Sequence, residues 1–170
     1  DVSDEVLKAL ERMGINTPTD IQKETIPVMM AGRDIIGIAP TGTGKTIAFG
    51  IPMLEYISLK DTRVQELVLA PTRELAMQIV QDLMDLARFI PQINIAALYG
   101  GQPISRQLNQ LKRKPQIVVA TPGRMIDMVN RGHVSLQHVH TMVLDEADEM
   151  LNMGFVKDVT RIIEMVPVGG

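Results

Sequence analysis

Residues 39–46 read APTGTGKT and directly follow a short apolar run, Ile35-Ile36-Gly37-Ile38. A helix is predicted from about Lys45, so the glycine-rich stretch forms the turn between a strand and a helix. Glycines let backbone N–H groups point inward, and the helix N-terminus adds partial positive charge. Lys45 can reach the outer phosphates of a nucleotide, and the Thr46 hydroxyl can ligate Mg²⁺. The stretch predicts a phosphate-binding loop, although Ala39 replaces the usual first glycine and an unliganded glycine-rich turn is the alternative.

Apolar strands and amphipathic helices alternate outward from this loop. Further strands are predicted at about residues 67–70, 93–98, 117–120 and 141–144. Helices are predicted to end at Gly14, Gly32 and about Phe89, and three more to lie around residues 104–111, 125–129 and 156–163. This pattern predicts an α/β domain, with a mainly parallel sheet covered by helices on both faces. Ligands of such sheets bind at the carboxyl ends of the strands.

Length and composition limit the classes of protein to which the chain can belong. The chain has 170 residues and a net charge of −3, which fits one globular domain over residues 1–170 without a chain-wide basic footprint for nucleic acid. A few local donors could still bind phosphates. The absence of Cys excludes disulfides, a Cys-based zinc site and a thiol nucleophile. No apolar run approaches membrane-spanning length and Asp1-Val2-Ser3-Asp4 does not resemble a secretory signal, so we expect a cytoplasmic protein without a membrane partner. The missing initiator Met suggests a piece of a longer chain.

A pair of carboxylates ends the last predicted strand. Asp145 and Glu146 follow Thr141-Met142-Val143-Leu144. Neighbouring residues at a strand end point to opposite sides, so one carboxylate can face Mg²⁺ while the other contacts a water nucleophile. The alternative is an acidic first turn of the following helix, where negative charge suits the helix dipole.

These motifs together resemble the DEAD-box RNA helicases. Residues 145–148 spell DEAD, and the resemblance extends over nearly the whole chain through residues 18–22 (PTDIQ), 39–46 (APTGTGKT), 71–76 (PTRELA), 100–101 (GG) and 121–124 (TPGR). In that family an alanine is usual at the position of Ala39. The resemblance implies a RecA-like P-loop NTPase domain that binds ATP and Mg²⁺ and hydrolyses ATP to separate RNA strands locally.

The resemblance also implies roles for individual nucleotide-site residues. Gln22 would read the adenine edge. Phosphate contacts would come from Thr41, Gly42, Thr43, Gly44, Lys45 and Thr46. Thr46 and Asp145 would hold Mg²⁺, partly through water, and Lys45, Asp145 and Glu146 would be catalytic, with Glu146 orienting or deprotonating the attacking water. Asp148 would couple the nucleotide to the rest of the helicase core.

The remaining motifs imply a binding surface for the RNA backbone. Its residues would be Thr72, Arg73, Gly101, Thr121, Gly123 and Arg124. Arginines are charge-assisted donors to phosphate, and glycines permit close backbone approach. Such contacts carry no base information, so we expect sequence-independent, salt-dependent binding. From the residues alone, the favoured explanation is that Arg73 and Arg124 are helix-face arginines paired with Glu74 and Asp127, and only the family motifs favour RNA contact.

Two elements of the family lie outside this sequence. The chain ends at Gly170, before the Ser-Ala-Thr motif, whose strand lies between the phosphate-loop strand and the DEAD strand in RecA-like helicases. We therefore expect a gap at the centre of the sheet, or an opened, swapped or oligomeric domain. The second RecA-like domain, which is the expected partner across the ATP cleft, is also absent. We expect the isolated chain to bind nucleotide, hydrolyse it very slowly and not unwind RNA. Another P-loop NTPase, or a non-catalytic RNA- or partner-binding module, is the alternative.

Overall fold

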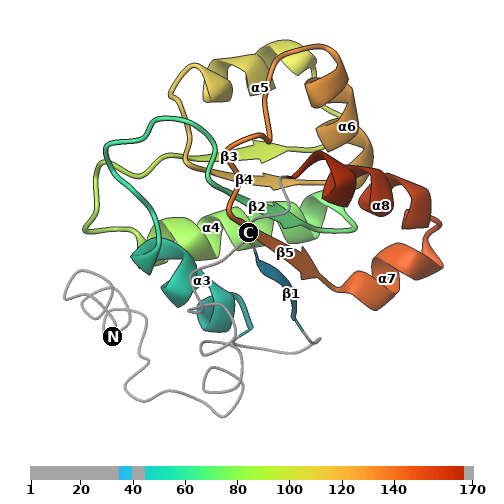
Figure 1. The fold of residues 1–170 in the computed structure, drawn as a ribbon, viewed down its shortest axis with the longest axis horizontal. Coiled ribbons are helices and arrows are strands. Elements are labelled where there is room, and N and C mark those ends of the chain that lie inside the picture. Colours follow the sequence, from blue (N-terminus) through green and yellow to red (C-terminus); the bar gives the residue numbers. More distant parts are fainter. Residues whose placement is uncertain (1–34, 40–44, 167–170) are drawn as a thin grey trace.

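The computed structural model describes residues 35–39 and 45–166, and residues 1–34, 40–44 and 167–170 lie outside this description (Figure 1). The two helices predicted before the phosphate loop therefore lie outside the described residues.

The described residues form one five-stranded sheet. Its strands are β1 (Ile35–Ala39), β2 (Glu66–Leu69), β3 (Ile95–Leu98), β4 (Ile117–Ala120) and β5 (Thr141–Asp145). The strand order is β1-β5-β2-β4-β3, and every neighbouring pair is parallel. The predicted α/β class and parallel sheet are confirmed. The inner strands are apolar at nearly every position because both of their faces are covered.

Six helices follow the strands in the described part of the chain. They are α3 (Lys45–Glu55), α4 (Arg73–Leu86), α5 (Ile104–Leu111), α6 (Pro122–Asn130), α7 (Ala147–Asn152) and α8 (Val156–Met165). The predicted positions agree to within a few residues. The short helix α7 corresponds to the acidic helical turn considered as the alternative for the residues after Asp145.

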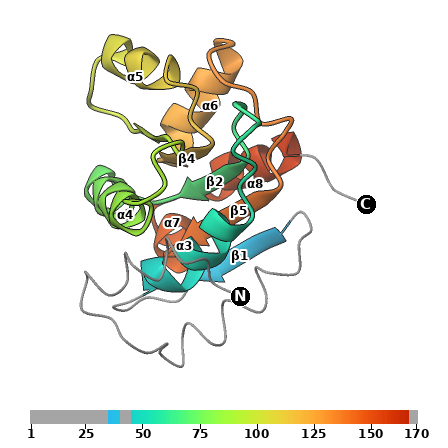
Figure 2. The ribbon, with the colours of Figure 1, turned by 90° about the vertical axis from the view of Figure 1, so that its left-hand side faces the viewer.

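The helices lie in two layers, one on each face of the sheet (Figures 1 and 2). Val68 and Val143 point into one apolar cluster, where they join α3 and α4 through fully buried Phe49, Ile79 and Leu83. The alternate strand residues point the other way, into a second cluster with α6 and α8. Because side chains alternate between the two faces along each strand, the core is divided into two clusters, one on each face of the sheet. Each fully buried large apolar side chain stabilises the folded state by about 1.5–3 kcal/mol.

The sheet has no gap between the phosphate-loop strand and the DEAD strand. β1 pairs directly with β5, from Ile35 opposite Thr141 to Ala39 opposite Asp145. The expectation of a central gap is wrong for this structure. Direct pairing gives the inner edge of β1 and the facing edge of β5 backbone hydrogen-bond partners, so a strand between them is not needed to satisfy those groups.

Candidate nucleotide- and RNA-binding site

The strand order determines where the candidate residues lie along the edge of the sheet formed by the carboxyl ends of its strands. β1 and β5 end beside each other, at Ala39 and Asp145. The next strands in order, β2, β4 and β3, end just before the turns that carry Arg73, Arg124 and Gly101. All five strands are parallel, so these ends share one side of the molecule. The candidate nucleotide residues therefore adjoin the candidate RNA residues, with β5 and β2 at the border.

The phosphate-loop motif is only partly within the described residues. Its lysine and threonine, Lys45 and Thr46, begin α3. Thr41, Gly42, Thr43 and Gly44 lie outside the described residues, as does Gln22. The described backbone has a strand before the motif and a helix after it, as a phosphate loop requires, since β1 ends at Ala39 and α3 begins at Lys45.

The two carboxylates after β5 have different surroundings. Asp145 is fully buried at the strand end. Glu146 is partly buried and adopts φ 52° and ψ 54°, the left-handed region, where it precedes α7. That conformation costs a residue with a Cβ about 1–2 kcal/mol and is found at functional sites. The chain therefore turns sharply between the two acids, and Asp148 lies in α7 directly beyond the turn.

The donor set fits Mg²⁺ bound together with a nucleotide. Among the described residues, no group of three or more His, Cys, Asp or Glu side chains is placed to hold a metal ion by itself. Mg²⁺ at nucleotide sites takes one or two protein oxygens and completes its shell with phosphates and water. The hydroxyl of Thr46 and the carboxylate of Asp145 are donors of this kind.

On the RNA side, the turn after β2 has a structural role of its own. Thr72 is the N-cap of α4, and its hydroxyl oxygen accepts a hydrogen bond from the Leu75 backbone N–H at 3.1 Å. The hydroxyl hydrogen remains available as a donor. Arg73 begins α4, and its Nη1 lies 3.7 Å from where a Cβ on Gly101 would stand. Gly101 has φ +81°, which favours glycine.

Arg124 joins the turns after β3 and β4. Its Nη1 and Nη2 each donate to the Gln102 carbonyl at 3.3 Å, and Nη1 also donates to Gln107 Oε1 at 3.1 Å. The alternative pairing with Asp127 is wrong, because Asp127 accepts from Arg131 Nε at 2.8 Å. Within the described residues, Arg73 likewise forms no ion pair with Glu74. Both arginines therefore face the turns at the strand ends.

The turn after β4 leaves polar groups open. Thr121 is the N-cap of α6, but its side chain makes no capping hydrogen bond. A Cβ placed on Gly123 would meet no described heavy atom within 4 Å. Packing of the described residues thus does not require glycine at this position.

Sequence reasoning missed Gln107 and Gln102, which hold Arg124. One signal was present: Gln107 lies on the same side of α5 as the apolar residues Ile104, Leu108 and Leu111. A polar residue inside an apolar stripe indicates a buried hydrogen-bonding role.

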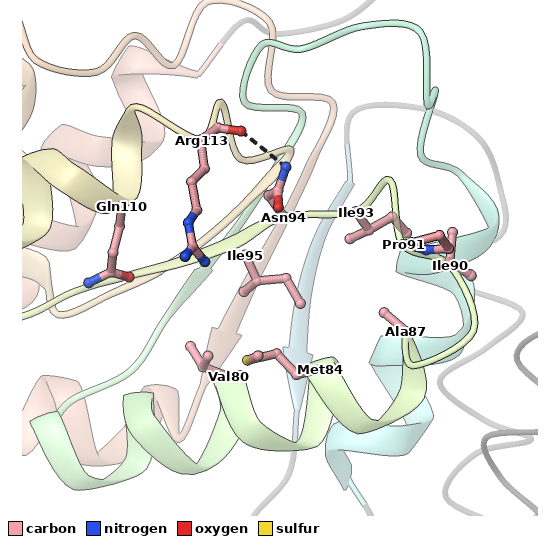
Figure 3. Close-up of a pocket in the computed structure, with 10 residues that line it drawn as sticks. All are labelled: Val80, Met84, Ala87, Ile90, Pro91, Ile93, Asn94, Ile95, Gln110 and Arg113. Carbon is pink, nitrogen blue, oxygen red and sulfur yellow. Dashed lines mark hydrogen bonds between the residues drawn. The ribbon is translucent and has the colours of Figure 1, made fainter.

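A separate hollow lies at the opposite, amino end of the strands. It measures about 400 Å³ and is lined by α4, the start of β3 and α5, including Met84, Ile95 and Arg113 (Figure 3). Asn94 Nδ2 donates to the Arg113 carbonyl at 3.0 Å beside it. None of the candidate nucleotide or RNA residues lines this hollow. In the described part of the chain, no helix has the length and apolarity to cross a membrane.

Comparison with known proteins agrees with the motifs. The profile of the DEAD/DEAH box helicase family matches residues 19–169. The chain belongs to this helicase family. The DEAD-box ATP-dependent RNA helicase CshA of Geobacillus kaustophilus is 52% identical over 98% of the chain, and the ATP-dependent RNA helicase CshA of Listeria monocytogenes is 51% identical over the same share.

The solved structures agree with this helicase assignment. The crystal structure of a hypothetical ATP-dependent RNA helicase from Sulfolobus tokodaii matches with a TM-score of 0.85 and 37% identity over 96% of the chain. The fold is therefore a RecA-like helicase domain. The chain covers only 35% and 32% of the two CshA proteins and 47% of the Sulfolobus chain, so it spans about a third to a half of their length.

Proposed function

We propose that residues 1–170 form the N-terminal, ATP-binding RecA-like domain of an RNA-dependent ATPase that separates RNA strands locally. One observation supports this most strongly: beside the ends of β1 and β5, the segments after β2 and β4 each carry an arginine, and both arginines face the backbone of the turn after β3. A P-loop enzyme that acts on a small molecule has no need of a row of phosphate donors beside its nucleotide site. The proposal places the protein in the cytoplasm, where ATP and RNA are both available.

The nucleotide half divides the chemistry among a few side chains. Gln22 would select adenine, and residues 41–46 would hold the phosphates with backbone N–H groups. Thr46 and Asp145 would hold Mg²⁺, which, when bound, neutralises charge on the phosphates. Lys45 would bind the outer phosphates, and Glu146 would orient the attacking water or take its proton. The left-handed conformation of Glu146 supports this role, because it ends the strand directly after Asp145 and places Glu146 at the turn into α7.

The RNA half offers donors to phosphate and sugar. Three of the five N–H groups of Arg124 take part in hydrogen bonds to Gln102 and Gln107, so two remain for an RNA phosphate. Arg73 adds a second guanidinium. The hydroxyls of Thr72 and Thr121 and the backbone at Gly101 and Gly123 complete the surface. The set supports contacts to the RNA backbone without base readout.

The proposed enzyme needs a second RecA-like domain as a partner. The limited share of each CshA relative that the chain covers is consistent with further domains there. In the family that domain supplies arginines that stabilise transition-state charge, and an arginine finger is worth about 10³–10⁵ in rate. Asp148, directly after the catalytic turn, would couple the two. The chain alone is then expected to bind nucleotide, hydrolyse it very slowly and leave duplexes intact.

The first test is calorimetric titration of the chain with ADP and with GDP in the presence of Mg²⁺. We expect ADP to bind, GDP not to bind, and ADP binding to be lost in Lys45→Ala and in Gln22→Ala. The second test joins the chain to a second RecA-like domain and measures ATP hydrolysis with and without RNA. Hydrolysis that RNA does not stimulate would favour a different P-loop NTPase, and no ADP binding would contradict the nucleotide site itself.

A further inference from the structure

Helix α5 buries one side chain fully, and that side chain is polar. Gln107 is 1% exposed, while its apolar neighbours on the helix are only partly buried. A buried amide destabilises the fold by about 1–3 kcal/mol unless its polar atoms are hydrogen-bonded. We therefore expect the buried amide of Gln107 to have hydrogen-bond partners, and these partners indicate the role of the residue.

Both ends of the Gln107 amide have partners. Its Nε2 donates to the Tyr99 carbonyl at 2.7 Å, and its Oε1 accepts from Arg124 Nη1 at 3.1 Å. A carbonyl can only accept and a guanidinium can only donate, so the orientation of the amide is fixed. Gln107 thus links the end of β3 to an arginine that lies beyond β4.

Arg124 also binds the other end of the turn that follows β3. Arg124 donates twice to the Gln102 carbonyl, and Tyr99 and Gln102 bracket the pair Gly100-Gly101. Two consecutive glycines form a conformationally free segment, and Gly101 has φ +81°. The network therefore fixes both ends of a segment that its own residues would leave loose. Gln107 is the buried member of this network, and among the described residues its side chain hydrogen-bonds no residue of the proposed RNA surface other than Arg124.

We propose that Gln107 is a positioning residue for RNA binding. It sets the distance between the Gly100-Gly101 turn and the Thr121–Arg124 turn, and it aims the two remaining N–H groups of Arg124 at the phosphate that the glycine turn approaches. This inference rests on the proposed function, because it assigns to Gln107 the orientation of an RNA-contacting arginine.

The test measures RNA affinity against salt concentration in the protein extended by a second RecA-like domain, with a single-stranded RNA probe. Each phosphate contact contributes about 0.7 to the slope of log affinity against log salt. Arg124→Met removes a charge and should lower that slope by about 0.7 and the affinity about tenfold. Gln107→Met, which keeps the side-chain length, removes no charge but should lower slope and affinity by a similar amount. The double variant should be no weaker than Arg124→Met.

Two variants make the result specific. Gln110 lies one turn along α5, and its Oε1 accepts from the Ala97 backbone N–H at 2.8 Å, within β3 rather than in either turn of the proposed RNA surface. Gln110→Met should therefore leave the salt slope unchanged. Gln107→Asn keeps a buried amide but is one methylene shorter, so it cannot reach the Tyr99 carbonyl and Arg124 at once; it should lower the slope as Gln107→Met does, and it carries the test if Gln107→Met does not fold. ADP affinity should be unchanged in all of these variants.

The outcomes separate the two proposals. A salt slope that Gln107→Met leaves unchanged, while Arg124→Met lowers it, would overturn the positioning role and leave the proposed function intact. A slope that stays at the unsubstituted value in Gln107→Asn would overturn it in the same way. Absence of RNA binding by the unsubstituted protein, or an Arg124→Met slope equal to that of the unsubstituted protein, would overturn the RNA surface and the inference together.

Discussion

Replacing Glu66 should stabilise the chain, and increasingly so as pH rises. Glu66 begins the central strand β2, opposite Ile117 on one side and Thr141 on the other. It is fully buried, and among the described residues neither carboxyl oxygen has a hydrogen-bond partner. Strand alternation points it to the same face as Val68, into the apolar cluster under α3 and α4. Burial raises the pKa of this carboxyl well above its usual value of 4.5.

The sign of the pH effect follows from that direction. Below about pH 4.5 Glu66 is protonated in both the folded and the unfolded chain, so ionisation costs nothing. As pH rises further, the unfolded chain ionises first, and the fold loses up to about 1.4 kcal/mol for each pH unit until the folded pKa is reached. Between pH 5 and 7 the loss from this one group is therefore at most about 3 kcal/mol. The unpaired neutral carboxyl adds a pH-independent cost of about 1–3 kcal/mol.

Urea unfolding at several pH values, followed by circular dichroism, tests this reasoning. Glu66→Met should be more stable than the unsubstituted chain at pH 5, and its advantage should grow toward pH 7. Glu66→Gln is the matched control, because it removes the titration but keeps a buried polar group; it should lose the pH dependence and retain the constant cost. A Glu66→Met variant that is less stable at pH 7, or an advantage that does not change with pH, would refute the assignment of a neutral, unpaired carboxyl.

Three further predictions concern backbone geometry. Gly123→Ala should keep or raise stability, by up to about 1 kcal/mol from helix propensity, yet weaken RNA binding, since only RNA is expected to approach this glycine; equal RNA affinity in a filter-binding assay would contradict that. Gly50→Ala should destabilise the chain by about 1 kcal/mol in urea unfolding, because its methyl would stand 2.7 Å from Leu86 Cδ1 and 3.0 Å from Leu83 Cδ2; combining it with Leu86→Ala should remove that penalty. Glu146 adopts φ 52°, which asparagine tolerates, so Glu146→Asn should keep the backbone turn and ADP binding, while RNA-stimulated ATP hydrolysis in the two-domain protein is lost; hydrolysis at the unsubstituted rate would contradict the catalytic role.

Much of the fold could be predicted from sequence because its strands are continuous apolar runs. Ile117-Val118-Val119-Ala120 is buried on both faces, so its sequence leaves little choice but a covered inner strand. The order of the strands in the sheet could not be predicted in the same way. It depends on which edges meet in three dimensions, and the expected gap beside β5 was an inference from the family rather than from these residues. The structure instead pairs Ala39 with Asp145 directly.

The candidate site shows the same division between local and non-local information. The phosphate-loop and DEAD residues are contiguous in sequence, so their placement at strand ends follows from local pattern. The contact between Arg124 and Gln107 spans 17 residues and joins two turns, and no local pattern specifies it. Glu66 is similar: beside Gln65 it looks like the polar entrance to a strand, and only the central place of β2 buries it.

The hydrogen bonds that the candidate RNA-binding residues make within the protein limit the kind of contact that they would make with RNA. Thr72 uses one lone pair of its hydroxyl oxygen to cap α4 and keeps its hydroxyl hydrogen, and Arg124 uses three of its five N–H groups to hold the β3 turn and can only donate with the other two. Phosphate and sugar oxygens accept from donors whatever the base is, whereas reading a base edge requires donors and acceptors in a matched pattern. Guanidinium groups that can only donate would therefore suit the backbone of any RNA strand under the proposed function, and discrimination among bases is not expected from these residues.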